Sequence, residues 1–305
     1  MGNIYIIGRG AIGSALAAQW QDKGSRATFI CDPKRKNRYM NEKFNINGRS
    51  YFFTYTVPGD LETPADIIFL SVKYHHLDEI CSLIEDSMGE DTLIVSLLNG
   101  VDSEEILALR FGEDRIVNAM IKNIDATMAG SALTFTRNGI IVFGDRTGKY
   151  PRNVPRVKQA LEAGNISYEI EEDILQAQWW KFMVNVGVNQ VSALLKARYR
   201  KFQGNKDIQI LARSAMEEVV AIAGKSGINL LSDDIDTAFA MLADYSPDGM
   251  TSMLQDVEGQ RKTEVEMLSG VILRLGQEIN IPTPVNRVLF HAIKAMESEY
   301  LADSK

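Results

Sequence analysis

The sequence is poor in features that mark several common classes of protein. It has only two cysteines among 305 residues, Cys31 and Cys81, in a predicted strand and a predicted helix, which argues against a disulfide framework or a metal site. Lys and Arg number 33 against 40 Asp and Glu, giving a net charge of -7, so a nucleic-acid-binding surface is not expected. The one basic cluster, residues 33–38, is too short to change that expectation.

Long apolar runs are also missing. The first one, residues 4–7, is interrupted at once by glycine and is too short for a signal peptide or a membrane span. Residues 174–195 are more apolar, but they include Lys181, asparagines and glutamines, each of which would need a polar partner in lipid. We therefore expect a cytoplasmic protein without membrane contacts, in which residues 174–195 form a buried helix.

The first half of the chain alternates short apolar runs with amphipathic segments, a pattern typical of a parallel sheet wrapped by helices. The predicted strands are residues 4–7, 27–31, 66–71, 92–97 and 115–120, and hairpins are predicted to turn at Asn47-Gly48 and at Asn138-Gly139. After Glu171 only helical periodicities follow. The sequence thus predicts an α/β, doubly wound Rossmann-type domain over residues 1–168 and an all-α domain over residues 169–305.

A glycine motif, GRGAIG, links the first strand to the first helix. Gly8 permits a tight turn, Gly10 lets the backbone approach a pyrophosphate, and Gly13 lets the helix pack closely on the strand. The match is informative because a strand precedes it and a helix follows it. It predicts a dinucleotide site formed by Gly8, Arg9, Gly10, Ala11, Ile12 and Gly13.

The residues after the second strand give conflicting signals about the cofactor. Asp32 lies at about the 20-residue distance from the glycine motif where an acidic group meets the ribose 2′-hydroxyl, which favours NADH. Lys34 and Arg35 follow immediately and are suited to hold the 2′-phosphate of NADPH. Both cofactors stay open, with Asp32 favouring NADH.

A single lysine interrupts the apolar segment 174–195. Lys181, Asn185 and Asn189 are spaced by four residues, which places them within about 80° of one face of an α-helix. Their neighbours are almost all apolar. A buried lone ammonium is costly, so Lys181 either reaches the surface along its alkyl chain or faces a polar site.

A carboxylate shows the same kind of misplacement. If residues 256–277 form one helix, Glu264 shares an apolar stripe with Val257, Leu268, Val271 and Leu275. A position at the polar edge of this stripe would also explain Glu264. A misplaced ammonium and a misplaced carboxylate are explained most simply if both face one cleft.

These residues bring the chain close to a known family. Over essentially its whole length it resembles the ketopantoate reductases (2-dehydropantoate 2-reductases). The motifs that carry the resemblance are GRGAIG, SVKYHH with Lys73, LLNG with Asn99, WWKFMVNVGVN, TSMLQDVEGQRKTE with Ser252 and Glu264, and IPTPVNRVLF. The resemblance implies a Rossmann domain, a helical domain and an active site in the cleft between them.

The resemblance also implies residue roles. Lys181 would be the general acid and Glu264 a polar anchor of the site. Asn185, Asn189 and Ser252 would hold the substrate, while Lys73 and Asn99 would face the cofactor, with Asn99 also near the substrate. Hydride transfer to the ketone carbon of a 2-oxo acid leaves an alkoxide that needs a proton and a nearby positive charge, and a lysine whose pKa is lowered by apolar surroundings can supply both.

Two departures from the family pattern keep other functions open. Asp32 stands where family members commonly have a basic residue, and Tyr199-Arg200 stand where many have an asparagine-glycine pair. The implied substrate is a small 2-oxo acid, ketopantoate first. The alternatives are an NAD-dependent D-2-hydroxyacid dehydrogenase acting on a branched or aromatic 2-oxo acid, and a nucleotide-sensing module without turnover. A homodimer is compatible with the sequence.

Overall fold

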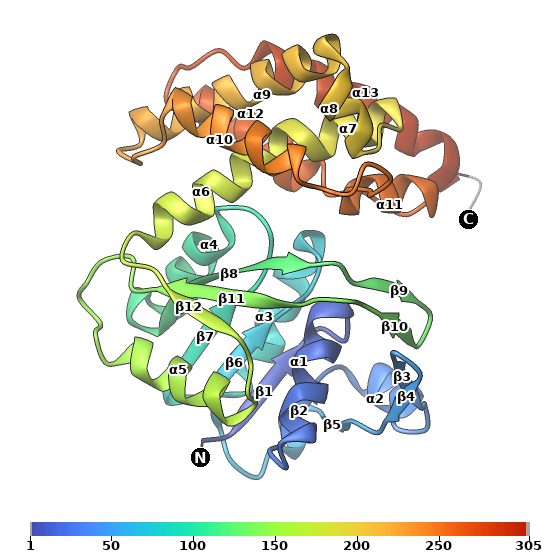
Figure 1. The fold of residues 1–305 in the computed structure, drawn as a ribbon. Coiled ribbons are helices and arrows are strands. Elements are labelled where there is room, and N and C mark those ends of the chain that lie inside the picture. The colour runs from blue at the N-terminus through green and yellow to red at the C-terminus, as the bar shows by residue number, and fades with distance from the viewer. Residues whose placement is uncertain (1, 303–305) are drawn as a thin grey trace. The chain divides into compact units, whose positions relative to one another are not determined.

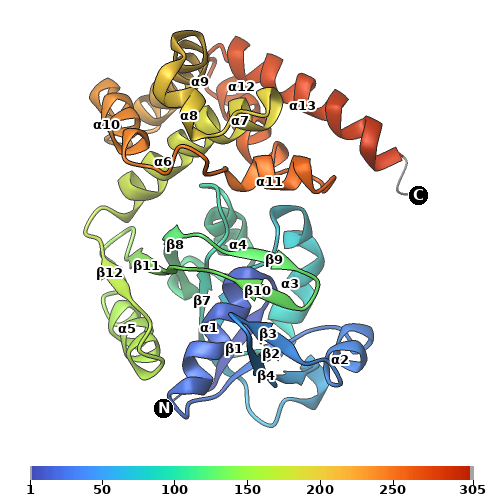
Figure 2. The same ribbon diagram turned by 45° about the vertical axis from the view of Figure 1, so that its right-hand side comes forward.

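The computed structural model describes residues 2–302 and divides into two compact units, which meet in sequence between Ile174 and Leu175. The sequence places this boundary between residues 168 and 169. The first unit is an α/β unit, and the second consists of helices over the part of the chain that is described (Figures 1 and 2).

The first unit is built on a mostly parallel, eight-stranded sheet in the order β12-β11-β8-β7-β6-β1-β2-β5. Its strands are β1 (Ile4–Ile7), β2 (Ala27–Ile30), β5 (Thr54–Thr56), β6 (Ala65–Leu70), β7 (Met88–Ser96), β8 (Ile116–Ile124), β11 (Asn138–Gly144) and β12 (Tyr168–Ile170). The helices are α1 (Ala11–Asp22), α2 (Pro33–Tyr39), α3 (Leu77–Glu85), α4 (Ser103–Phe111) and α5 (Asn153–Ala163), with short 3₁₀ turns η1 (Pro58–Asp60), η2 (Tyr74–His76) and η3 (Glu113–Arg115).

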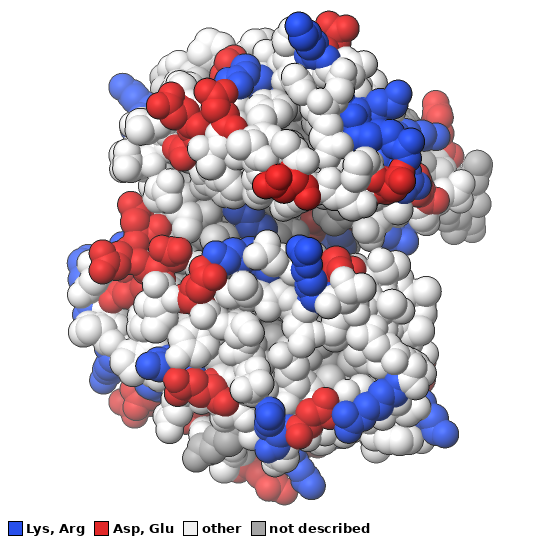
Figure 3. Space-filling view, viewed as in Figure 1, with Lys and Arg blue, Asp and Glu red and all other residues white. Residues whose placement is uncertain are grey.

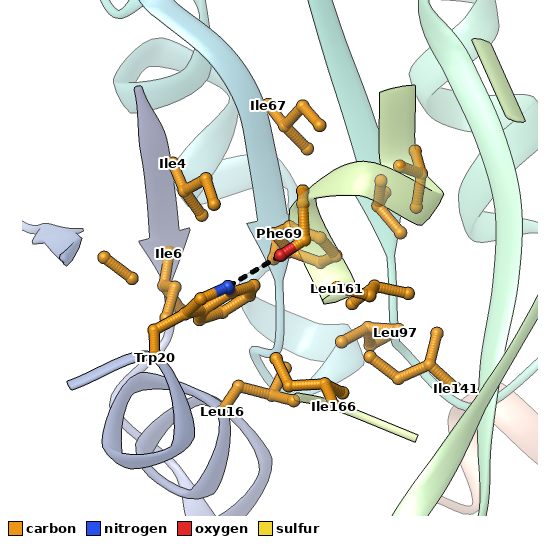
Figure 4. Close-up of a cluster of buried hydrophobic side chains, with 14 of the residues drawn as sticks. Ile4, Ile6, Leu16, Trp20, Ile67, Phe69, Leu97, Ile141, Leu161 and Ile166 are labelled. Atoms are coloured by element: carbon orange, nitrogen blue, oxygen red, sulfur yellow. Dashed lines mark hydrogen bonds between the residues drawn. The ribbon is translucent and has the colours of Figure 1, made fainter. Parts of the chain in front are cut away.

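Both faces of this sheet are buried, which is why its central strands are almost wholly apolar. Along β1, Ile4 and Ile6 face a core with α1 and α5, while Tyr5 and Ile7 face a core with α3 and α4 (Figure 1). Figure 4 shows the first core around Trp20, whose indole Nε1 donates a hydrogen bond to the carbonyl of Ala160 at 2.8 Å. This bond ties α1 to α5 inside the core.

A smaller sheet, β4-β3-β10-β9, lies beside α1. It consists of β3 (Phe44–Ile46), β4 (Arg49–Tyr51), β9 (Thr127–Ala129) and β10 (Ala132–Thr134). The hairpin at Asn47-Gly48 is present, with positive φ at both residues. The hairpin predicted at Asn138-Gly139 is wrong: β10 pairs with β9 and β3, whereas β11 pairs with β8.

The reason for this error lies in the loop before β11. The carboxylate of Asp125 accepts hydrogen bonds from the backbone N–H groups of Thr136 and Arg137, both at 2.8 Å, and this connection separates β10 from β11. Gly139 is a residue of β11, and a Cβ there would lie 2.9 Å from the side chain of Ile121 on β8. Glycine suits this position because its backbone has φ +78° and β8 approaches closely, not because a two-residue turn lies there.

Up to residue 302, the second unit consists of helices joined by loops. They are α6 (Ile174–Val184), α7 (Gln190–Leu195), α8 (Tyr199–Gly204), α9 (Lys206–Lys225), α10 (Ser232–Ala243), α11 (Ser252–Glu258), α12 (Val271–Glu278) and α13 (Pro284–Ala302), with two π-helical segments, η4 (Asn185–Asn189) and η5 (Glu266–Gly270). Gly187 lets η4 approach α9 closely, since a Cβ there would lie 2.8 Å from the carbonyl of Ala212.

Surface charge is mixed in both units. On the face that Figure 3 displays, Lys and Arg side chains lie among Asp and Glu side chains. Among the described residues, no helix combines the length and the apolar composition that a membrane span requires.

Candidate active site

The glycine loop lies at the point where the strand order of the sheet reverses. From β1 the chain continues to β2 and β5 on one side and then returns to β6 on the other side of β1, and ligands of such sheets bind beyond the carboxyl ends of the strands at this point. Gly8 follows β1 with φ +112°, and a Cβ there would lie 2.6 Å from the carbonyl oxygen of Ser71. The Ser71 hydroxyl donates to the carbonyl of Gly8 at 2.9 Å.

Gly13 and Gly10 are glycines for different reasons. A Cβ at Gly13 would lie 2.1 Å from the carbonyl oxygen of Gly8, so the fold itself excludes a side chain there. At Gly10 the nearest atom to a Cβ would be the Ser71 oxygen at 3.6 Å, an ordinary contact, and φ is -85°. The protein itself does not require glycine at position 10, so its absence of a side chain fits the close approach of a phosphate group.

The N-terminus of α1 is suited to the same group. Gly10 is its N-cap residue, no side chain caps it, and its first turn has no acidic residue. The backbone N–H groups of Ala11, Ile12 and Gly13 lie at the positive end of the helix dipole and are therefore suited to bind an anion. These features fit the pyrophosphate of a nicotinamide dinucleotide.

Arg9 has a role that the sequence did not indicate. Its side chain is only 8% exposed, with a guanidinium nitrogen 2.6 Å from a carboxylate oxygen of Glu42 and the guanidinium carbon 3.6 Å from the ring centre of Tyr39. Burial alone would lower the pKa of Arg9, but hydrogen bonds with Tyr55 and Glu42 raise it. The side chain thus joins the glycine loop to the segment that follows α2.

Asp32 is the N-cap residue of α2. Its Oδ1 accepts a hydrogen bond from the backbone N–H of Arg35 at 2.9 Å, and the Arg35 side chain approaches its Oδ2 at 3.3 Å. Lys36 lies 2.7 Å from the carboxylate of Asp60. Arg35 and Lys36 are therefore directed to carboxylates, while Lys34 is exposed.

Lys73 and Asn99 lie at the same edge of the sheet as the glycine loop. Lys73 follows β6 and is exposed, and Asn99 follows β7 and is half-buried. Because β1, β2, β6 and β7 run parallel, the topology alone brings these residues to the edge that carries Gly8 and Asp32. Sequence reasoning did not single out Ser71, because the predicted strand over residues 66–71 includes it, whereas β6 ends at Leu70.

In the second unit the polar line of residues 181–189 is clearly visible. Lys181, Asn185 and Asn189 are each half-buried, whereas Met183, Val186 and Val188, between them in sequence, are at most 1% exposed. Gln178 and Ser192 do not extend this line, because both are buried, and the Ser192 hydroxyl donates to the carbonyl of Ala197 at 2.7 Å. Three polar side chains therefore reach the surface of the unit along one face.

The helix that carries this line is not a continuous α-helix. Residues 185–189 form the π-helical segment η4, so that Asn185 begins it and Asn189 ends it. A π turn rotates less per residue than an α turn, which moves Asn189 back toward the direction of Lys181. Single π turns inside α-helices are frequent at functional sites.

Glu264 does not lie on a helix, which corrects the predicted helix over residues 256–277. Helix α11 ends at Glu258, the backbone of Gln260 is left-handed with φ +51°, and Arg261 N–H donates to the carbonyl of Asp256 at 2.8 Å. This arrangement closes the helix as a C-terminal cap does. Glu264 is half-buried in the segment that leads into η5, and its carbonyl accepts from Leu268 N–H at 3.0 Å.

Charged neighbours surround the start of η5. Hydrogen bonds from Lys294 and Lys262 lower the pKa of Glu266, the first residue of η5. Lys294 lies 2.8 Å from one carboxylate oxygen of Glu266, and Lys262 lies 2.9 Å from the other. The segment that carries Glu264 is thereby held to α13.

Ser252 is the first residue of α11 and is exposed. Thr251 is the cap of this helix, since its hydroxyl oxygen accepts from Leu254 N–H at 3.1 Å. The same hydroxyl lies 3.0 Å from that of Ser192 in α7, the helix that directly follows Asn189. Ser252 is in this way attached to α7, which continues directly from the segment that carries Asn185 and Asn189.

The predicted residues therefore fall into two sets, one in each unit. Within residues 2–302, no group of three or more His, Cys, Asp or Glu side chains is arranged to hold a metal ion. Cys31 and Cys81 are buried free thiols, and burial raises the pKa of Cys31 to about 11. The chemistry available is that of a dinucleotide site, a lysine, amides, a hydroxyl and a carboxylate.

Comparison with known proteins gives a consistent result. The model of the family "Ketopantoate reductase PanE/ApbA" matches residues 4–148, and the model of its C-terminal part matches residues 173–297. The curated 2-dehydropantoate 2-reductase of Pyrococcus horikoshii is 26% identical over 97% of both chains. That of Archaeoglobus fulgidus is also 26% identical, over 97% of this chain and 98% of its own.

Solved structures share the fold over nearly the whole chain. A dimeric ketopantoate reductase from Staphylococcus aureus has a TM-score of 0.81 and 24% identity, covering 98% of this chain and 99% of its own. A D-mandelate dehydrogenase in a ternary structure with NADH and anilino(oxo)acetate has a TM-score of 0.87 and 19% identity, with the same coverage.

Proposed function

We propose that this chain, which belongs to the ketopantoate reductase PanE/ApbA family, is a 2-dehydropantoate 2-reductase that forms D-pantoate for pantothenate synthesis. The observation that carries the proposal is the half-buried line of Lys181, Asn185 and Asn189 on an otherwise buried helix, in a chain that also has a complete glycine loop. The relatives named 2-dehydropantoate 2-reductase support the choice of substrate.

The proposed roles follow from the chemistry of ketone reduction. When bound, a reduced nicotinamide dinucleotide supplies the hydride. Lys181 donates a proton from Nζ to the carbonyl oxygen as negative charge develops there, and the remaining amine regains a proton from water. The amides of Asn185 and Asn189 donate hydrogen bonds that orient the substrate without adding charge.

Two further residues hold the rest of the substrate. Ser252 donates a hydrogen bond to the carboxylate of the 2-oxo acid, and Glu264 accepts one from a substrate hydroxyl. In the first unit, the N–H groups at the start of α1 bind the pyrophosphate, and Lys73 and Asn99 contact the nicotinamide half of the cofactor. A homodimer, as named for the relative from Staphylococcus aureus, is part of the proposal and is checked by light scattering.

For the cofactor, we infer that NADH is used at least as well as NADPH. Asp32 lies two residues after β2. Its second carboxylate oxygen, Oδ2, accepts a hydrogen bond from a ribose hydroxyl, and the negative charge of the carboxylate repels a 2′-phosphate. Arg35 and Lys36 are directed to Asp32 and Asp60, which reduces their capacity to hold a phosphate.

A reductase assay that crosses a panel of 2-oxo acids with NADH and NADPH tests the proposal. We expect the highest kcat/KM with 2-dehydropantoate and a ratio for NADH over NADPH of one or more. An NADPH preference above roughly 10-fold, or 1.4 kcal/mol, would show that the basic residues outweigh Asp32. No turnover with any 2-oxo acid would overturn the proposed function and favour a nucleotide-sensing module.

A second candidate, reduction of an aromatic 2-oxo acid with NADH, is favoured by Tyr199. Its ring packs edge-to-face on Tyr245, with centroids 5.0 Å apart, and its N–H donates to the carbonyl of Gly249 at 3.2 Å. Burial raises the pKa of Tyr199 to about 12. An aromatic wall of this kind suits an aromatic side chain, so turnover of phenylglyoxylate without turnover of 2-dehydropantoate would select this candidate.

A further inference from the structure

The two π-helical segments of the second unit lie in contact with each other. Asn185 and Asn189, two of the proposed substrate-holding residues, are the first and last residues of η4, and Glu264 lies just before η5. π-helical residues make up well under 1% of proteins, so two such segments at one set of candidate residues call for a physical cause.

A fully buried bridge of three side chains joins these segments. Gln190, Ser269 and Asn286 each have 0% exposure, and they come from α7, η5 and α13. The Ser269 hydroxyl oxygen lies 2.5 Å from Gln190 Oε1 and 3.0 Å from Asn286 Oδ1, and Gln190 Nε2 donates to Asn286 Oδ1 at 3.2 Å. We refer to these three residues as the buried bridge.

The orientations of both side-chain amides in the buried bridge are fixed from one end. Glu218, on α9, accepts from Asn286 Nδ2 at 2.8 Å, and the carbonyl of Ala215 accepts from the same amide at 3.1 Å. A carboxylate and a carbonyl can only accept, so Asn286 must present its oxygen to the other two residues. Gln190 must then donate to that oxygen through Nε2, and the single proton of Ser269 is directed to Gln190 Oε1 or to Asn286 Oδ1, both of which can only accept.

The buried bridge also acts on η4 directly. Gln190 Nε2 donates to the carbonyl of Val186, inside η4, at 2.8 Å. The side-chain amide thus supplies a donor to the backbone of a segment whose usual helical hydrogen bonding is shifted by one residue. Without Gln190, the carbonyl group of Val186, a residue with 0% exposure, would lose a donor.

The other side of Glu264 is anchored as well. Glu297, on α13 and 2% exposed, accepts from the backbone N–H of Thr263 at 2.5 Å and from its hydroxyl at 2.6 Å. Glu264 therefore lies between two buried attachments, one through Thr263 and one through Ser269 in η5. Both attachments lead to α13.

We propose that Gln190, Ser269 and Asn286 are positioning residues, which set η4 against η5 and so fix Asn185 and Asn189 relative to Glu264 for substrate binding. None of the three reaches the surface, so they act only through the residues that they place. This inference rests on the proposed function, since it concerns the geometry in which the 2-oxo acid is held.

The test is Ser269→Ala in the full-length protein, which removes the hydroxyl without adding volume. Its matched control is Ile222→Val, which removes one methyl group from a fully buried side chain of α9 and should lower stability without removing any hydrogen-bonding group of the buried bridge. Steady-state kinetics, NADH titration, thermal unfolding and amide hydrogen exchange of residues 185–189 are measured for both variants.

In Ser269→Ala we expect kcat/KM for 2-dehydropantoate to fall by about tenfold or more, because a displacement of about 1 Å can cost up to ~100-fold in rate. Amide exchange in η4 should become faster, while the dissociation constant of NADH changes by less than about twofold, because its proposed ligands are in the first unit. Ile222→Val should lose thermal stability but keep kcat/KM and the exchange of η4.

Wild-type kcat/KM and wild-type exchange of η4 in folded Ser269→Ala would overturn the proposal and leave the buried bridge as a stabilising feature only. If Ser269→Ala does not fold, Ser269→Cys, which keeps a weak donor, replaces it, with an intermediate loss expected. If the wild-type protein reduces no 2-oxo acid, the proposed function fails, and the exchange of η4 alone then decides whether the buried bridge positions this segment.

Discussion

At the scale of single residues, adding one methyl group at Gly10 can separate the two functions of the glycine loop, which are folding and cofactor binding. We predict that Gly10→Ala folds with unchanged or slightly higher stability, because its φ of -85° suits alanine and replacing glycine at such a position stabilises by about 0.4–1 kcal/mol. Its affinity for NADH should fall about tenfold or more, or 1.4 kcal/mol, because the methyl group occupies the approach of the pyrophosphate. Thermal unfolding and NADH titration measure both effects.

Gly13→Ala is the matched control for this prediction. Its Cβ would lie 2.1 Å from the backbone oxygen of Gly8, so the fold must shift, and overpacking of this kind costs about 1–3 kcal/mol. This variant should therefore unfold at lower temperature. A Gly10→Ala protein that binds NADH as tightly as the wild type would exclude the loop as the pyrophosphate site.

A second prediction at this scale concerns Lys181. Lys181→Ala should lower kcat by at least ~10²-fold, the low end for a general acid, while NADH affinity stays close to wild type because the glycine loop belongs to the other unit. Lys201→Ala, an exposed lysine of α8, is the control and should keep full activity. If Lys181→Ala is folded and keeps most of its turnover, Lys181 is not the acid.

Individual site residues could be predicted from the sequence only where their local spacing points to a function. The glycine motif and the Lys181 line are local patterns, and the roles of their residues stay predictions. The contacts of Arg9 with Tyr39, Glu42 and Tyr55 could not be predicted, because they join positions far apart in the chain through a turn of unknown direction. The partners of Gln190 in α13 were hidden for the same reason.

At the scale of elements, α2 shows how one side chain can serve a helix and a cofactor. Asp32 caps α2 through Oδ1, and asparagine caps a helix about as well as aspartate. We predict that Asp32→Asn keeps thermal stability but raises the ratio of kcat/KM for NADPH over NADH by about tenfold, because the negative charge is removed. The ratio is measured with 2-dehydropantoate as the common substrate.

Asp32→Ala separates the two roles. It removes both the charge and the cap, so it should show the same change in cofactor ratio together with a loss of about 1 kcal/mol in the free energy of unfolding. An Asp32→Asn protein with an unchanged cofactor ratio would leave Asp32 as a helix cap without a part in cofactor choice.

Elements were predicted well where a regular period extends over the whole element and poorly where it is broken. The central strands of the sheet agree with the prediction to within a few residues. The predicted helix over residues 256–277 is wrong because its apolar spacing continues past the point where the helix ends. The left-handed backbone at Gln260 ends it, and the sequence gives no sign of this at position 260, since such a conformation is expected at Gly, Asn or Asp and not at Gln. The π turn at residues 185–189 is equally invisible, since its neighbours are apolar almost all round and a shift in helical phase leaves no mark on such a pattern.

At the scale of the whole molecule, the change from alternating to purely helical periodicity was enough to predict an α/β unit followed by helices. The order of the strands was not predictable, because local patterns do not state which strands are neighbours. That order is what brings Gly8, Asp32, Lys73 and Asn99 to one edge of the sheet. The predicted boundary at 168/169 and the division at Ile174 differ because the last turn before α6 belongs to the contacts of the first unit.

The division into two units leads to a prediction about the protein as a whole. All proposed NADH ligands lie before residue 100, so NADH at 100 times its dissociation constant should stabilise the first unit by about 2.7 kcal/mol. We expect hydrogen exchange measured by mass spectrometry to slow in β1, α1 and residues 71–73 and 97–100. Helices α9 and α13, which belong to the other unit, should be protected much less.

The control for this prediction is Gly10→Ala, whose fold should be intact and whose protection at the same NADH concentration should fall to about 1.4 kcal/mol or less, as follows from a tenfold or greater loss of affinity. Equal protection throughout both units would mean that they unfold as one cooperative body, because a ligand then stabilises every region that opens only by global unfolding. Unchanged exchange in β1 and α1 of the wild-type protein would place the dinucleotide elsewhere, and the assignment of the glycine loop would be wrong.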